Sequence, residues 1–171
     1  MKMSAASLTS LVDWEVLSKA RKEATMSLKI LLSKWVSGET ATGSVMVKRK
    51  QRKYSNCPMC QRDDETTTHI LQCQSNTIKE LRKELLSELK VWLVSKETNP
   101  EITTFLCDGL YSWFQSTCYD IDQNTNVTTK IAFGNQIIIG WESLLHGFLS
   151  TKLIRCQQEH YISLKKKETW N

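Results

Sequence analysis

The chain has 171 residues, of which 40% are hydrophobic and 24% charged, with a formal net charge of +5 and a pI near 8.9. A chain of this length and composition can bury a core without metal or disulfides, which excludes wholesale disorder. Six glycines and two prolines leave few helix breakers, so helices are favoured. The mild positive charge permits a polyanionic partner, and it fits equally a lysine-rich surface without one.

The compartment is inferred from the cysteines and the N-terminal segment. Six cysteines could form three disulfides in a small secreted protein. However, the first residues, MKMSAASLTSLVDW, lack the apolar core of a signal peptide, and the longest apolar stretch, near 137–141, is too short to span a bilayer. We therefore expect an intracellular protein, cytoplasmic or nuclear, with no membrane partner.

The N-terminal third is predicted to contain two helices and a basic loop. Residues 1–10 are small and polar and are predicted to be a flexible tail. Asp13 is the expected N-cap of a helix that starts at Trp14, and Gly38 is expected to end a second helix over 24–36. One face of this second helix carries the apolar residues Leu28, Leu31, Leu32 and Trp35. The polar stretch 38–56 follows, with a turn at Gly43.

The rest of the chain is predicted to add four longer helices. They cover 76–96, a segment starting at Asn99-Pro100, 127–149, and 150–167, with a loop over 119–130. The first carries a stripe of apolar residues at helical spacing, which are Ile78, Leu81, Leu85, Leu86, Leu89, Trp92 and Leu93. Four tryptophans at helical spacing are interpreted as core residues in preference to base-stacking ones, namely Trp35, Trp92, Trp113 and Trp141.

A cysteine-rich segment between the second and third long helices carries the clearest chemical signal. Cys57 and Cys60 are separated by two residues, so one tight turn can place both sulfurs on one cation. His69 and Cys73 are four residues apart and would share one face of a helix. Three cysteines and one histidine form a closed, structural zinc site, because no position is left for water or substrate. A redox pair at Cys57 and Cys60 is the alternative, without the βαβ context that such a pair requires.

Five cations in six residues precede this segment. Lys48, Arg49, Lys50, Arg52 and Lys53 could contact phosphates, and Tyr54 adds a ring that could stack on a base. The same run could equally be a solvated loop or a nuclear-import signal. The three remaining cysteines, Cys107, Cys118 and Cys156, lack partners at ligand spacing and are expected to be core or surface thiols.

The segment CPMCQRDDETTTHILQC resembles the zinc-binding segment that lies downstream of the reverse transcriptase in non-LTR-type retroelements. Three flanking blocks resemble retroelement-derived open reading frames abundant in some algal genomes: WEVLSKA (14–20), KWVSGETATGSVMVKRKQR (34–52) and QIIIGWESLLHGFLSTKLIRCQQEHY (136–161). The chain departs from the last block at Phe148 and Leu153, where the family tends to carry Arg and Trp. The resemblance implies that Cys57, Cys60, His69 and Cys73 are zinc ligands in a nucleic-acid-associated accessory region.

The sequence thus predicts a mainly α fold of about six helices with an inserted CCHC zinc knuckle. Its expected divisions are 1–10, 11–56, 57–73 and 74–171. We expect no enzymatic activity, because Asp63-Asp64 lies inside the zinc loop with no strand before it and cannot build a two-metal polymerase site. RNA or DNA is the expected partner, together with a reverse transcriptase on another chain, and no small-molecule substrate. A helical protein-interaction module and an inactive retroelement relic are the alternatives.

Overall fold

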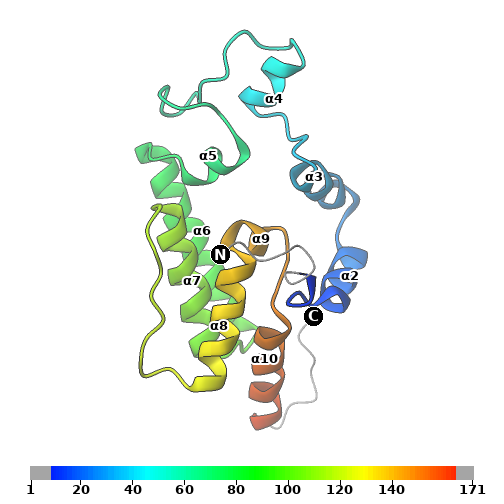
Figure 1. The fold of residues 1–171 in the computed structure, drawn as a ribbon, viewed down its shortest axis with the longest axis vertical. Coiled ribbons are helices and arrows are strands. Elements are labelled where there is room, and N and C mark those ends of the chain that lie inside the picture. The colour runs from blue at the N-terminus through cyan, green and yellow to red at the C-terminus, as the bar shows by residue number, and fades with distance from the viewer. Residues whose placement is uncertain (1–8, 165–171) are drawn as a thin grey trace.

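A computed structural model describes residues 9–164, and the fold of that part is mainly α-helical, as predicted (Figure 1). The helices are α2 (Trp14–Glu23), α3 (Met26–Val36), α4 (Gly43–Lys48), α5 (Thr67–Gln72), α6 (Asn76–Ser95), α7 (Pro100–Phe114), α8 (Val127–Ile139), α9 (Trp141–Leu145) and α10 (Thr151–Ser163). The short helices α4, α5 and α9 raise the number above the six expected. The predicted tail at 1–10 lies almost wholly outside the described residues, and the division into four segments stays a prediction.

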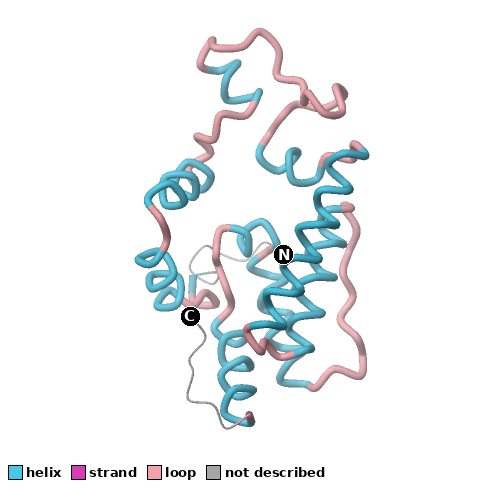
Figure 2. The backbone as a smooth tube through the Cα atoms, turned by 180° about the vertical axis from the view of Figure 1, so that it is seen from behind, coloured by secondary structure: helices cyan, strands magenta, loops and turns pink. Residues whose placement is uncertain are grey.

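The helices form a bundle and an arm. Helices α6, α7, α8 and α10 lie side by side with α9 at one end, whereas α2, α3 and α4 follow one another along the opposite side (Figures 1 and 2). Residues 49–66 cross from the end of the arm back to α5 and the bundle (Figure 1). This crossing carries Cys57 and Cys60, so the cysteine turn lies where the two parts of the chain meet.

Local capping explains where many of these helices begin. Asp13 accepts a hydrogen bond from the backbone N–H of Val16 at 3.0 Å, which confirms it as the N-cap of α2. Asn99 caps α7, and Pro100 occupies its first turn, as predicted. Gly38 has a φ of +70°, a left-handed conformation that suits glycine and that follows the end of α3.

The core lies between α7, α8 and α10. The rings of Phe105 and Phe133 stack with centroids 4.0 Å apart, and Trp141 packs 5.1 Å from Phe105. A Cβ atom on Gly109 would lie 2.0 Å from the Trp141 ring, so the absence of a side chain there allows this packing. Cys107 and Cys156 are buried in the same cluster, and Cys118 is exposed.

Two buried glutamines join α10 to the ends of other helices. Gln136 accepts from the backbone N–H of Ser150 at 2.9 Å, and Gln157 accepts from that of Asn99 at 2.8 Å. Both side chains are fully buried. Buried amides of this kind satisfy backbone groups where helices end, and they fix how the helices are placed.

The predicted helix over 127–149 is wrong in its length. Gly140 has a φ of +99°, which ends α8 at Ile139 and lets the chain turn into the short α9. The last helix, expected over 150–167, ends at Ser163. The lysine run at 165–167 lies outside the described residues.

The apolar stripe of α6 is buried only in part. Leu93 is buried, but Leu81, Leu85 and Trp92 are 47%, 53% and 49% exposed. The helix turns a neighbouring face to α7, and that face buries Arg82 at 7% exposure. Hydrophobic spacing therefore predicts the helix, and the face that α6 buries is rotated by part of a turn from the stripe.

The prediction that four tryptophans are core residues is correct only in part, and α3 is largely exposed along its length. Trp141 is a core residue, and Trp35 and Trp113 are half-buried, whereas Trp92 is exposed. None of the residues of α3 is buried, and Leu28 and Leu31 are 43% and 48% exposed. The arm therefore presents apolar side chains to solvent in a way that the sequence alone does not predict.

Candidate metal centre

The first half of the centre is a tight turn over residues 57–61. The backbone N–H of Cys57 donates to the carbonyl of Asp63 at 2.8 Å, and that of Gln61 donates to the carbonyl of Cys57 at 2.8 Å. Gln61 has a φ of +58°, an uncommon conformation for a residue with a side chain. An isolated antiparallel bridge between Asn56 and Asp64 closes the segment that contains the turn. The turn brings the Cys57 and Cys60 sulfurs to the same side.

The second half of the centre is supplied by α5. Thr66 caps this helix by accepting from the backbone N–H of His69 at 3.0 Å. His69 lies within the helix, and Cys73 is its C-cap. Thr68 hydrogen-bonds Glu142 of α9 at 3.3 Å, which attaches α5 to the bundle. The helix therefore presents a nitrogen and a sulfur toward the turn from a fixed position.

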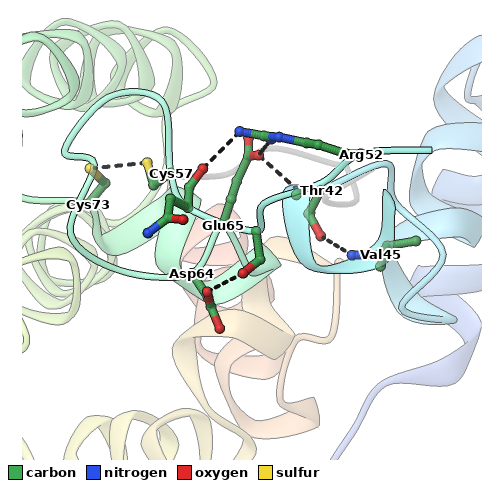
Figure 3. A network of polar contacts seen from close by, with 10 residues as sticks. Thr42, Val45, Arg52, Cys57, Asp64, Glu65 and Cys73 are labelled. Atoms are coloured by element: carbon green, nitrogen blue, oxygen red, sulfur yellow. Dashed lines mark hydrogen bonds and ion pairs between the residues drawn. The ribbon is translucent and has the colours of Figure 1, made fainter. Parts of the chain in front are cut away.

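The four predicted ligands come together in the structure. Their ligand atoms all lie within 4.8 Å of one another. The Cys57 and Cys73 sulfurs are 3.9 Å apart, and Cys60 Sγ lies 3.3 Å from His69 Nε2 (Figure 3 shows the Cys57–Cys73 pair). Bond lengths at tetrahedral zinc imply about 3.8 Å between two sulfurs and about 3.6 Å between sulfur and nitrogen. These four residues could hold a metal ion.

The surroundings of the two cysteines of the turn shift their pKa values in opposite directions. The backbone N–H groups of Asp63 and Arg62, followed by the His69 side chain, lower the pKa of the Cys60 thiol to about 6. Burial raises the pKa of Cys57, although the N–H groups of Cys60 and Met59 oppose this effect. Hydrogen bonds to sulfur favour the thiolate, which is the form that binds metal.

The histidine is oriented with one nitrogen toward the sulfurs and one away from them. Asp63 Oδ2 lies 3.8 Å from His69 Nδ1, on the side opposite the Nε2 that faces Cys60. A carboxylate beside the second nitrogen of a metal-binding histidine commonly fixes the ring and its tautomer. Cys60 and His69 also line a surface groove, whereas Cys57 and Cys73 are buried, so solvent reaches one side of the centre.

A polar network joins the cysteine turn to the basic loop and α4 (Figure 3). Arg52 Nη1 donates to Glu65 Oε2 at 2.6 Å, and Arg52 Nη2 donates to the carbonyl of Asn56 at 2.9 Å. The backbone N–H of Gly43 donates to the same Glu65 oxygen at 2.9 Å. A Cβ on Gly43 would lie 2.6 Å from the carbonyl of Ser55, so this close approach requires glycine.

The five cations predicted to contact nucleic acid have different surroundings. Arg52 pairs with Glu65 and Arg49 pairs with Glu39. Lys48, Lys50 and Lys53 are exposed, and within residues 9–164 none of them has an ion-pair partner. Lys53 lies over the ring of Tyr54, with 5.2 Å between Nζ and the ring centroid. The arginines hold the loop in place, and the three lysines remain available for an external anion.

Arg82 is the residue at the centre that sequence reasoning missed. Its side chain is buried beside Cys73 and donates to the carbonyl of that residue. Its position in the sequence could have indicated this, because residue 82 lies four residues from both Ile78 and Leu86. A helix that turns Ile78, Leu86 and Leu93 inward therefore turns residue 82 inward as well. The predicted hydrophobic stripe includes Leu81 and Leu85 and does not include Arg82.

Comparison of the chain with protein-family models, with curated proteins and with solved structures found no match. Within the described residues, no helix is both long and apolar enough to cross a membrane.

Proposed function

We propose that Cys57, Cys60, His69 and Cys73 bind one structural zinc ion. The observation that carries this proposal is the convergence of three sulfurs and one imidazole nitrogen within 4.8 Å. Thiolate and imidazole ligands in a four-coordinate arrangement suit zinc, and four protein ligands leave no open position for catalysis. The zinc would hold the 57–61 turn against α5.

The test is the metal content of protein purified under reducing conditions. We expect one zinc per chain in the wild type and loss of zinc in the Cys57→Ser/Cys60→Ser variant. Cys118→Ser is the matched control, because Cys118 is an exposed free cysteine outside the cluster. A metal-free wild-type protein, or equal zinc in the double variant, would show the proposal to be wrong.

We further propose that the chain is a non-catalytic, nucleic-acid-binding accessory region derived from a retroelement reverse transcriptase polyprotein. The zinc motif and its flanking blocks support this ancestry by resemblance. The exposed lysines Lys48, Lys50 and Lys53 support the binding role, since they have no ion-pair partner within residues 9–164. The exposed Tyr54 ring beside them offers a surface on which a base can stack. RNA or DNA would bind this loop, and a polymerase on another chain would act on it.

The salt dependence of binding to RNA and DNA oligonucleotides tests this role. Lys48→Ala/Lys50→Ala/Lys53→Ala should weaken binding and reduce the slope of log K against log salt by about two to three, because each lost phosphate contact removes about 0.7 to 0.9. The control Lys90→Ala/Lys96→Ala/Lys152→Ala makes the same charge change on exposed positions of α6, its C-cap and α10. Equal salt-dependence slopes in the two triple variants would show that the lysines of the loop do not contact nucleic acid. Arg52 is left intact because it pairs with Glu65.

A protein-interaction role is the second candidate, and a groove between α2 and α3 favours it. The groove has a volume of about 600 Å³. Its apolar lining is Trp14, Leu17, Leu32, Val36 and Phe148, and its charged lining is Arg21, Lys22 and Lys29. Among the described residues no acidic side chain lines it. Charge complementarity therefore selects a partner segment with apolar anchors and acidic flanks.

Tryptophan fluorescence can test this groove, because Trp14 lines it. We expect an amphipathic peptide of leucine and glutamate to bind, and a peptide with lysine in place of glutamate not to bind. Leu32→Asp should abolish the binding, and Leu81→Asp on the exposed face of α6 should not. Equal binding of the two peptides, or of the two variants, would exclude this second role.

A further inference from the structure

Arg82 lies on the inward face of α6 with 7% of its surface exposed. Its guanidinium donates to the carbonyl of Leu71 at 2.9 Å, to that of Phe114 at 2.8 Å, and to that of Cys73. It also lies 5.5 Å from the centroid of the Phe114 ring. One side chain thus joins the end of α5, the middle of α6 and the end of α7.

The partners of Arg82 satisfy its hydrogen bonds but not its charge. All of its hydrogen-bond acceptors are neutral carbonyls, and no carboxylate pairs with it within residues 9–164. A buried cation without an opposite charge is costly, because the low-dielectric interior does not replace the lost water. A negative charge close to Cys73, whose carbonyl accepts from Arg82, would therefore stabilise the buried guanidinium.

The metal centre supplies that charge when it is loaded. A divalent ion with three thiolates and one neutral imidazole carries a net charge of −1, and Cys73 contributes one of the thiolates. We propose that Arg82 is the buried counter-charge of the metal centre and couples its occupancy to the packing of α5 against α6 and α7. This inference rests on the zinc site proposed above.

Neighbouring contacts explain how such coupling would reach the bundle. Gln72 Nε2 donates to the carbonyl of Trp113 at 2.8 Å, and Gln74 Nε2 donates to that of Phe114 at 2.9 Å. These bonds and those of Arg82 meet at the C-terminal end of α7. Removal of the metal leaves Arg82 buried without an opposite charge, so the same end of α7 should loosen. By linkage, the free energy by which the bound metal stabilises the Arg82 charge equals the free energy by which that charge stabilises metal binding. Removal of the positive charge should therefore weaken metal binding.

The experiment measures zinc affinity by competition with a chromogenic chelator in the full chain. Arg82→Gln keeps hydrogen-bond donors and removes the charge, and Arg82→Lys keeps the charge and removes the planar donors. We expect Arg82→Gln to lose about 10- to 100-fold in zinc affinity, and Arg82→Lys to recover most of it. Lys83→Gln is the matched control, since Lys83 is exposed on the same helix, and it should bind as wild type.

A second readout separates charge coupling from simple loss of structure. Zinc should raise the unfolding midpoint of the wild type and of Arg82→Lys more than that of Arg82→Gln. Arg82→Gln with wild-type affinity and an equal zinc-induced shift would overturn the inference, as would equal losses in the glutamine and lysine variants. A wild type without bound zinc would instead overturn the zinc site itself, so the two failures are distinguishable.

Discussion

Arg52 Nη1 lies 2.6 Å from Glu65 Oε2, and this ion pair joins the basic loop to the segment that follows the cysteine turn. The two side chains are 33% and 18% exposed, so solvent screens them only in part. The pair has a structural consequence for any binding role of the loop. Arg52, one of the predicted nucleic-acid contacts, is thus paired within the protein, whereas Lys50 and Lys53 on either side of it are exposed to solvent.

The Glu65 carboxylate should therefore matter for stability. Glu65→Ala removes the acceptor of both Arg52 and the Gly43 N–H, and we expect the free energy of unfolding to fall by about 2 kcal/mol. Urea denaturation of zinc-loaded protein measures this change. Glu80→Ala removes an exposed ion pair with Lys83 and should change the same quantity by less than about 0.5 kcal/mol. Similar losses in both variants would contradict a structural role for Glu65.

The prediction from sequence succeeded where the determinants are local. The sequence predicts a helix over 76–96, and α6 is observed over Asn76–Ser95, because the spacing of apolar residues within one segment determines it. The four candidate ligands were found for the same reason, since each pair is close in sequence. Their grouping within 4.8 Å is confirmed, and the identity of the metal stays a prediction.

The prediction failed where distant residues decide the outcome. Whether Leu85 or Arg82 faces inward depends on the carbonyls that α5 and α7 present, and those lie 11 and 32 residues from Arg82. The break at Gly140 places Trp141 against Gly109 of another helix, a contact between residues 32 positions apart that local spacing does not reveal. The Arg52–Glu65 pair spans 13 residues of irregular chain, for which no periodic pattern exists.

Two glycines allow a matched test of the close packing around α4. Gly43→Ala places a Cβ 2.6 Å from a backbone oxygen of Ser55, and we expect it to lower the free energy of unfolding by about 1–3 kcal/mol. Gly134→Ala lies within α8 with open space around its Cβ, and we expect a gain of about 0.5–1 kcal/mol. Thermal and urea unfolding of both variants measure the changes. A neutral Gly43→Ala would show that α4 is loosely held.

The pKa of Cys60 predicts how the metal-free protein responds to pH. The folded state lowers this pKa from 9.0 to about 6, so the folded state binds fewer protons than the unfolded state between these values. Its contribution to stability is therefore complete above about pH 9 and is lost as the pH falls through about 6. The urea midpoint of metal-free wild type, measured against Cys60→Ser, should rise with pH across this window. A constant difference between the two proteins would contradict the lowered pKa.

The same thiolate should be selectively reactive. Iodoacetamide should modify Cys60 in metal-free protein at pH 7 before it modifies Cys57, because Cys57 is buried and its pKa is raised. Peptide mapping by mass spectrometry measures the order of modification. Added zinc should protect both cysteines, and it should leave the exposed Cys118 reactive. Faster modification of Cys57 than of Cys60 would show that the turn does not favour the Cys60 thiolate.

Removal of the metal should affect the crossing segment more than the bundle. The core around Phe105, Phe133 and Trp141 contains none of the four candidate ligands, so we expect it to stay buried without zinc. Chelated protein should keep most of its helical circular dichroism and should lose amide hydrogen-exchange protection over 43–73. Amides within α8 and α10 should remain protected, and those at the end of α7 near Phe114 should show an intermediate loss, since Arg82 contacts that carbonyl. Loss of protection throughout the described helices on chelation would contradict this prediction, because it would show that the bundle does not stay folded without the metal.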